Sequence, residues 1–208
     1  MACVAKQRDA ERSRAAILAA AEALFAQRGY EAVTLSDIGD AAGVSRATPS
    51  YFFGSKEEVY VAALERVFAD REVAVERATA PLRAARGGDD AGLRRALDAA
   101  VTDYLRFLVE RPAFARLVAW EGLAGGRRLR ATPRASRALH DAFGAVGATR
   151  RRFDVDDAVL VFVTLTLSPV TQRDTFMTTL GRDLGDAATR RRHVRLVTDQ
   201  LMHLIAPS

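Results

Sequence analysis

The chain has 208 residues and is 49% hydrophobic, which is enough apolar surface for a real core and excludes disorder as the default interpretation. Its formal net charge is +5 and every basic residue except Lys6 and Lys56 is arginine, which fits an anionic partner, although a GC-rich genome produces the same arginine bias without one. Cys3 is the only cysteine and the longest apolar run, residues 158–167, is far shorter than a membrane span, so we expect no disulfide within the chain, no transmembrane helix and a cytoplasmic location.

Helical periodicity dominates the sequence, and no segment alternates with the period of two that a strand requires. We therefore predict an all-α fold. A first helix ends near Gly29, and its apolar face carries Ile17, Ala21, Leu24 and Phe25. Thr34 and Asp37 have the spacing of a capping box, which opens a short helix that Gly43 ends.

The next helices follow the same logic of caps and breakers. Ser45 is predicted to cap a second short helix that runs to about Phe52. Ser55 and Glu58 form another capping box, which opens a long helix towards Ala80. Beyond Pro81 we predict five helices, at about residues 93–110, 113–123, 133–151, 155–170 and 186–205.

The spacing of residues 34–56 is that of a helix-turn-helix. Gly43 can adopt a positive φ between the two short helices, and Val44 is an apolar plug beneath them. The second helix presents hydrogen-bonding groups and an aromatic ring, namely Arg46, Thr48, Ser50 and Tyr51. Helical corners of this kind are also common packing units in enzymes, but such a corner would explain neither this polar face nor the capped start at Ser55.

Residues 14–64, above all the GVSRAT segment at 43–48 and the YFFGSK segment at 51–56, resemble the DNA-binding domain of the TetR family. The resemblance implies a dimeric regulator with a three-helix DNA-binding domain at residues 9–58. A larger helical-bundle domain for ligand binding and dimerisation follows at 59–208. Three positions depart from the family pattern: Gly39 replaces the usual alanine and is expected to loosen its helix, Pro49 replaces leucine or isoleucine, and Ser50 replaces a tyrosine that touches the DNA backbone.

The candidate DNA-binding residues divide by role. The guanidinium of Arg46 suits the O6 and N7 acceptors of guanine, and Ala47 and Thr48 suit a thymine methyl group. Thr34 and Lys56 lie at helix N-termini, which attract phosphate, so we expect them to position the DNA backbone. Tyr51 can serve either purpose and take over part of the contact expected near Ser50.

The larger domain contains the run at residues 158–167, which is apolar all round its helix and needs cover on both sides. Pairing of this helix with the last one across a two-fold axis would supply the cover and form a homodimer. A central helix buried within one subunit is the alternative. A two-fold dimer predicts a palindromic operator in double-stranded DNA.

An apolar effector pocket between helices is predicted to use Tyr104, Phe107, Phe114, Leu117, Trp120, Phe143 and Phe162, with Glu121 or His140 as a polar contact. Taken one at a time, these residues are better candidates for the core, because aromatics at helical spacing are core residues more often than ligand contacts. The histidines have no metal-ligand spacing, so we predict neither a metal nor a cofactor.

The sequence therefore favours a transcription regulator, a repressor released or altered by a small effector. The alternatives are a helical enzyme and a dimeric DNA-binding protein without an effector. No phosphate loop, nucleophile motif or paired catalytic constellation supports the enzyme, so we predict that the protein is not one.

Overall fold

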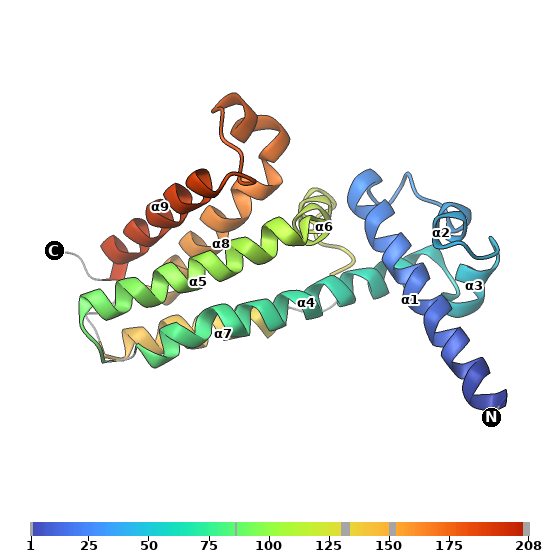
Figure 1. Ribbon diagram of the computed structural model, residues 1–208, viewed down its shortest axis with the longest axis horizontal. Coiled ribbons are helices and arrows are strands. Elements are labelled where there is room, and N and C mark those ends of the chain that lie inside the picture. The colour runs from blue at the N-terminus through green and yellow to red at the C-terminus, as the bar shows by residue number, and fades with distance from the viewer. Residues whose placement is uncertain (1, 86, 130–133, 150–152, 206–208) are drawn as a thin grey trace. The chain divides into compact units, whose positions relative to one another are not determined.

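A computed structural model of the chain describes residues 2–85, 87–129, 134–149 and 153–205. Every regular element within these ranges is a helix, so the all-α prediction is confirmed. In chain order (Figure 1) the elements are α1 Ala2–Arg28, α2 Leu35–Ala42, α3 Thr48–Phe53, α4 Lys56–Ala84, α5 Asp90–Glu110, α6 Pro112–Leu123, α7 Arg134–Gly147, α8 Val155–Thr171, the π-helix η1 Arg173–Met177 and α9 Ala187–Ile205.

The chain forms two compact units, and the first comprises Met1–Ala69 and Arg116–Ala131. In this unit α2 packs against α1 and α3. The predicted apolar face of α1 is buried, because Ile17, Ala21 and Phe25 are fully inaccessible to solvent. Complete burial of one large apolar side chain contributes roughly 1.5–3 kcal/mol, so this face holds α1 against the short helices.

The second unit comprises Asp70–Ala115 and Thr132–Ser208. Here α5 packs against α8 and α9, and α7 packs against α8. The buried core includes Leu97, Val101, Tyr104, Leu108, Phe143, Phe162, Val197 and Leu201. Among the described helices of the chain, none combines the length and the apolar character needed to cross a membrane.

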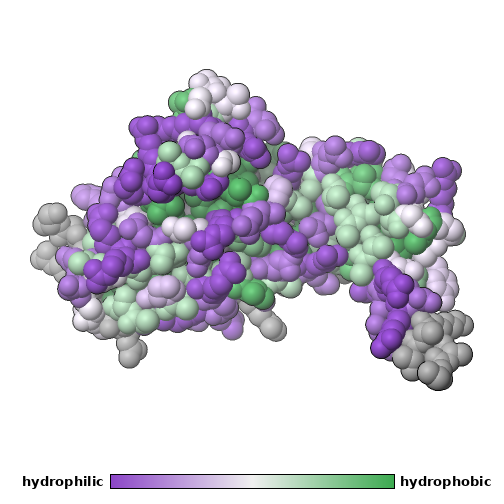
Figure 2. Space-filling view, in the orientation of Figure 1, coloured by the Kyte–Doolittle hydropathy of each residue, from purple (hydrophilic) through white to green (hydrophobic). Residues whose placement is uncertain are grey.

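Several large apolar side chains of the second unit are exposed. Four large hydrophobic side chains on or beside α8, η1 and α9 are exposed, namely Leu160 (63%), Phe176 (62%), Leu180 (48%) and Leu196 (46%). Figure 2 shows hydrophobic residues lying between hydrophilic ones in the part of the molecule that holds these helices. Because Leu160 is exposed, α8 is not enclosed on all sides by its own subunit, and that alternative is wrong.

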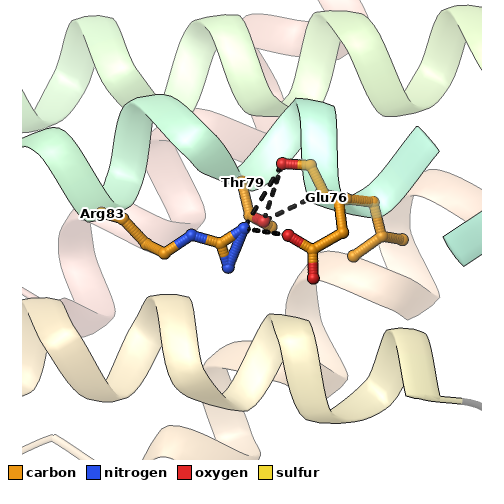
Figure 3. Close-up of polar contacts among 4 residues, drawn as sticks. Glu76, Thr79 and Arg83 are labelled. Carbon is orange, nitrogen blue, oxygen red and sulfur yellow. Dashed lines mark hydrogen bonds and ion pairs between the residues drawn. The ribbon is translucent and has the colours of Figure 1, made fainter. Parts of the chain in front are cut away.

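The long helix α4 continues to Ala84 through Pro81, so the predicted end just before this proline is wrong. Proline removes one intrahelical hydrogen bond, but side chains on either side of it add others (Figure 3). The hydroxyl of Thr79 donates to the carbonyl oxygen of Val75 at 2.8 Å, and the guanidinium of Arg83 donates to the carboxylate of Glu76. A helix of 29 residues tolerates the loss of one bond.

A second internal proline, Pro169, lies buried in α8. Its missing N–H leaves the carbonyl of Leu165, four residues earlier, without its helical donor. The imidazole Nε2 of His193 on α9 lies 2.7 Å from this oxygen and therefore donates to it. The proline thus creates an acceptor that joins α8 to α9.

Candidate DNA-binding site

The predicted helix-turn-helix is present as α2, a tight turn and α3. The hydroxyl of Thr34 accepts a hydrogen bond from the Asp37 amide at 3.1 Å, and the Asp37 carboxylate accepts from the Thr34 amide at 2.8 Å. Hydrogen bonds from Thr34 also lower the pKa of Asp37. Gly43 ends α2 with a φ of +68°, in the left-handed region that favours glycine. The predicted capping box and glycine C-cap are confirmed.

The helix α3 begins at Thr48, later than predicted. The Ser45 hydroxyl forms a hydrogen bond with the hydroxyl of Thr48 at 2.8 Å and caps no amide of α3, so its expected role as N-cap is wrong. The reason is Pro49, which lies in the first turn of α3, where no intrahelical N–H bond is needed. A start at Ser45 would have placed this proline inside the helix.

The turn and α3 present a polar surface. Arg46, Ala47, Ser50 and Tyr51 are exposed, and Thr48 is half-buried. Tyr51 is 85% exposed, and its ring contacts Phe52 edge-on with the centroids 5.4 Å apart. The hydroxyl of Ser50 donates to the carbonyl of Gly54 at 3.0 Å. Most of the tyrosine ring therefore remains available to an outside partner.

Arg46 forms a two-point ion pair with Asp40 on α2. The Nε of Arg46 lies 3.1 Å from Asp40 Oδ1, and a terminal nitrogen lies 3.1 Å from Oδ2. The hydrogen bond to Asp40 raises the pKa of Arg46. Because the pair uses one edge of the guanidinium, the N–H groups of the other edge point away from it. Asp40 is a residue that sequence reasoning missed.

Gly39 is buried in α2 where the turn passes closest. A Cβ built at this position would lie 3.0 Å from both the Arg46 Cα and the Ser45 carbonyl oxygen. The absence of a side chain therefore lets the backbone that carries Arg46 approach α2, a role that the expected loosening of the helix does not describe.

Lys56 begins α4 after the predicted capping box. The Glu58 amide donates to the Ser55 hydroxyl at 3.2 Å, and the Ser55 amide donates to the Glu58 carboxylate at 2.8 Å, so this box is confirmed. The Lys56 ammonium donates to the Glu31 carbonyl at 3.2 Å and lies 4.3 Å from the centroid of the Tyr30 ring. The loop after α1 thus holds the ammonium beside the start of α4.

Three predicted effector residues, Leu117, Trp120 and Glu121, belong to the first unit. Glu121 is 1% exposed and accepts hydrogen bonds from the Tyr60 hydroxyl at 2.9 Å and the Arg128 amide at 3.1 Å. Burial, together with the hydrogen bond to Glu121, raises the pKa of Tyr60. The same unit buries Leu117, and the Trp120 indole donates to a carbonyl of α1 at 3.3 Å.

The other six lie in the second unit. Tyr104 stacks on Phe162 with ring centroids 5.4 Å apart, and Phe162 and Phe143 meet edge-on at 5.9 Å. Phe107 stacks on Tyr104 at 6.1 Å. His140 is exposed and lies 2.7 Å from a carboxylate oxygen of Asp156. Phe107 also meets Phe114 with ring centroids 5.7 Å apart, so the structure brings five of the nine candidates together, and none of the nine lines either cavity described in this unit.

Sequence reasoning also missed Arg71, which is only 5% exposed. Its Nε donates to the Tyr104 hydroxyl at 3.1 Å, and its guanidinium lies 5.8 Å from the Phe114 ring centroid. The available signal was its register in α4, since Val67 and Val75, four residues to either side, are buried.

Comparison with known families gives two matches. The family described as "Bacterial regulatory proteins, tetR family" matches residues 17–63. The family described as "Tetracyclin repressor-like, C-terminal domain" matches residues 94–201, which is more than half of the chain. The predicted resemblance is confirmed in both parts of the sequence.

Two curated relatives illustrate the range of similarity. The chain is 35% identical to the HTH-type transcriptional regulator RutR of Escherichia coli over 124 residues, which are 58% of this chain and 52% of that protein. This match thus spans about half the length of the relative. The chain is 26% identical to the HTH-type transcriptional repressor NicS of Pseudomonas putida over 204 residues, which are 93% of this chain and 92% of that protein.

Solved structures show the same fold at low sequence identity. A TetR family transcription regulator from Marinobacter aquaeolei has a TM-score of 0.62 and 22% identity, covering 93% of this chain and 97% of that one. The fatty acid degradation regulator FadR from Bacillus halodurans has a TM-score of 0.64 and 18% identity, covering 90% and 93% respectively.

Proposed function

Because the chain belongs to the TetR family of bacterial regulators, we propose that it binds a specific operator in double-stranded DNA and represses transcription. The single observation that carries this proposal is the capped helix-turn-helix, whose second helix and preceding turn expose hydrogen-bonding side chains and the ring of Tyr51. Residues 9–58 form the DNA-binding domain in this proposal. We further propose that the protein is not an enzyme and that it acts in the cytoplasm.

The proposed contacts follow from the geometry of the site. Arg46 reads guanine with the edge of its guanidinium that Asp40 does not occupy. The remaining contacts to bases and phosphates are made by exposed side chains and by residues at helix starts. These are Thr34, Ala47, Thr48, Ser50, Tyr51 and Lys56. Lys56 leaves its carbonyl partner for a phosphate at small cost, because a solvated ammonium exchanges hydrogen bonds readily.

The second part of the proposal is a homodimer formed through residues 59–208. The exposed apolar side chains around α8 and α9 support it, because monomeric proteins rarely leave several large hydrophobic residues exposed together. Two-fold symmetry presents two copies of α3 to one duplex, so the operator is palindromic.

The third part is a small-molecule effector that binds within residues 59–208 and changes operator affinity. The predicted aromatic residues Tyr104, Phe107, Phe143 and Phe162 form a buried cluster beside Arg71 that lines neither described cavity, so the support for an effector comes from the regulator family to which the chain belongs. Both named relatives are described as transcriptional regulators or repressors, which is consistent with a repressor here.

Selection of the purified protein on a random pool of double-stranded DNA tests the proposal. We expect a palindromic motif that persists at two salt concentrations. In the Arg46→Ala variant, affinity for that motif should fall by about 1–3 kcal/mol and discrimination at one base pair of each half-site should relax. Only salt-sensitive binding without a sequence motif would overturn the proposal. An unchanged motif in the variant would overturn the role of Arg46.

A further inference from the structure

A groove with a volume of about 770 Å³ runs between α5 and α9 in the second unit. Its floor is apolar and includes Leu105, Val109 and Val194. Leu105 belongs to a buried cluster with Met177 and Leu184, against which the two valines pack. The floor is therefore a fixed part of the core and does not depend on mobile surface side chains.

The rim of this groove is strongly basic. It carries Arg106 from α5 and Arg190, Arg191 and Arg195 from α9, against the two carboxylates of Asp98 and Glu110. The formal charge of the lining is thus +2. Such an excess next to an apolar floor favours a ligand that combines an anionic group with an apolar body.

Two of the arginines and one carboxylate already have partners within the protein. Arg106 pairs with Asp103 at 3.1 Å. Arg190 donates to two main-chain carbonyl oxygens just before α9, at 2.7 and 2.8 Å. Asp98 accepts a hydrogen bond from the Thr198 hydroxyl at 2.7 Å.

Arg191 and Arg195 form no ion pair among the described residues. They lie four residues apart on α9, so both guanidinium groups project from the same face of the helix. Arg191 interacts electrostatically with the exposed Asp186 just before α9, but neither guanidinium is held in an ion pair within the described ranges, so the two neighbouring groups are a suitable donor set for one carboxylate.

We propose that this groove binds a small organic acid, with its carboxylate at Arg191 and Arg195 and its apolar body on Leu105, Val109 and Val194. The inference rests on the proposed function, because it names the chemical class of the effector and its site. The volume falls within the roughly 300–1,000 Å³ of typical ligand sites. The groove is distinct from the exposed apolar surface around α8, because none of the four exposed side chains of that surface lines it.

Isothermal titration calorimetry of the full chain with octanoate tests the proposal, and 1-octanol serves as the probe with the same apolar body and no charge. We expect octanoate to bind at least about tenfold more tightly than octanol, because charge-assisted hydrogen bonds contribute only for the anion. Absence of octanoate binding at millimolar concentration, or equal affinity for the two probes, would overturn the proposal.

Two variants with the same type of change locate the site. In Arg191→Gln/Arg195→Gln, octanoate affinity should fall by about tenfold or more while octanol affinity stays within about twofold. Arg192→Gln is the matched control, because Arg192 is exposed on the same helix but lines the other cavity. Equal losses in the control would overturn the proposal. Retained binding in the double variant with loss in Arg71→Met would also overturn it and move the acid to the aromatic cluster.

Operator binding by the same variants separates this inference from the proposed function. The double variant without octanoate should bind the selected DNA motif as the unmodified protein does, because neither arginine belongs to the DNA-binding domain. Failure of the unmodified protein to select any motif would refute the proposed regulator. Even in that case, calorimetry on DNA-free protein would still show whether the groove binds octanoate.

Discussion

At Gly39 two physical effects oppose each other. Alanine inside a helix is more favourable than glycine by about 1 kcal/mol. A Cβ at this position, however, would lie 3.0 Å from two backbone atoms of the turn, which cannot move aside as a flexible side chain can. We expect Gly39→Ala to lower the free energy of unfolding by about 1 kcal/mol, measured by urea denaturation, and to weaken DNA binding by displacing the backbone of Arg46.

The chain offers a matched control for this substitution. Gly144 lies inside α7, and a Cβ built on it meets nothing within 4 Å. Gly144→Ala should therefore raise the free energy of unfolding by about 0.5–1 kcal/mol and leave DNA binding unchanged. If both variants gain stability equally, the close approach at Gly39 has no energetic importance.

Tyr60 makes stability depend on pH in the alkaline range. Burial raises its pKa in the folded protein above the value near 10 of an unfolded chain, and the hydrogen bond to Glu121 adds to the shift. Below about pH 10 both states keep the proton and the contribution to stability is complete. Above it the unfolded chain releases the proton first, so this contribution is lost as pH rises towards the folded pKa.

Urea unfolding across this range measures the effect. The free energy of unfolding of the unmodified protein should fall more steeply above about pH 10 than that of Tyr60→Phe, which has no proton to lose at this position. Identical slopes for the two proteins would show that Tyr60 does not titrate differently in the folded and unfolded states.

Local residue roles could be predicted from the sequence, whereas partners across a turn or between helices could not. The boxes at Thr34 and Ser55 need only a spacing of three residues, and both are present. The pairing of Arg46 with Asp40 and the contact of Lys56 with the loop depend on how α2, the turn and the start of α4 pack. No spacing rule encodes such packing.

At the scale of elements, the contact between His193 and the Leu165 carbonyl gives a sharp test. His193→Ala should cost about 1–3 kcal/mol of unfolding free energy, because it leaves a partly buried carbonyl without a donor. His203→Ala, at an exposed position of the same helix, should cost less than about 0.5 kcal/mol.

A double-mutant cycle with Pro169 identifies the cause. Pro169→Ala restores an N–H four residues after Leu165, so the carbonyl regains a helical donor. In that background the cost of His193→Ala should fall by about 1 kcal/mol. Additive effects of the two substitutions would contradict the claim that the proline creates the need for the histidine.

Helix existence was predictable because caps, glycines and apolar periodicity act locally, and the predicted helices are present in order. The errors concern proline. The predicted helix places Pro49 too deep, and the predicted long helix ends before Pro81 although α4 continues past it. A proline disfavours a helix by a few kcal/mol, and tertiary packing can outweigh that cost. The π-helix η1 directly after α8 has no simple sequence signal.

At the scale of the whole molecule, the sequence predicts a DNA-binding part and a larger helical part, but it does not predict which segments fold together. Residues 116–131 follow the start of α6 in the chain, yet they form one unit with α1–α3. The hydrogen bond between Tyr60 and Glu121 joins residues 61 positions apart. The sequence predicts Trp120 as an apolar lining residue of the effector pocket and Glu121 as a polar contact, and neither residue type distinguishes one core from another.

Operator recognition by the proposed homodimer depends on the whole molecule. Leu160 on α8 and Leu196 on α9 are exposed at 63% and 46% in the single chain. Leu160→Asp/Leu196→Asp would place two charges in the proposed interface, and burying unpaired charges is costly. We therefore expect this variant to sediment as a monomer at concentrations where the unmodified protein is a dimer.

The effect on DNA should follow from the change of assembly. A monomer engages one half-site at a time, so affinity for the palindrome should fall by about a hundredfold or more while circular dichroism still reports a helical protein. Val73→Asp is the control, because Val73 is 70% exposed and lies on a different helix, α4. A dimeric double variant would place the interface elsewhere on the molecule. A monomeric variant with full affinity for the palindrome would mean that the two half-sites are read independently.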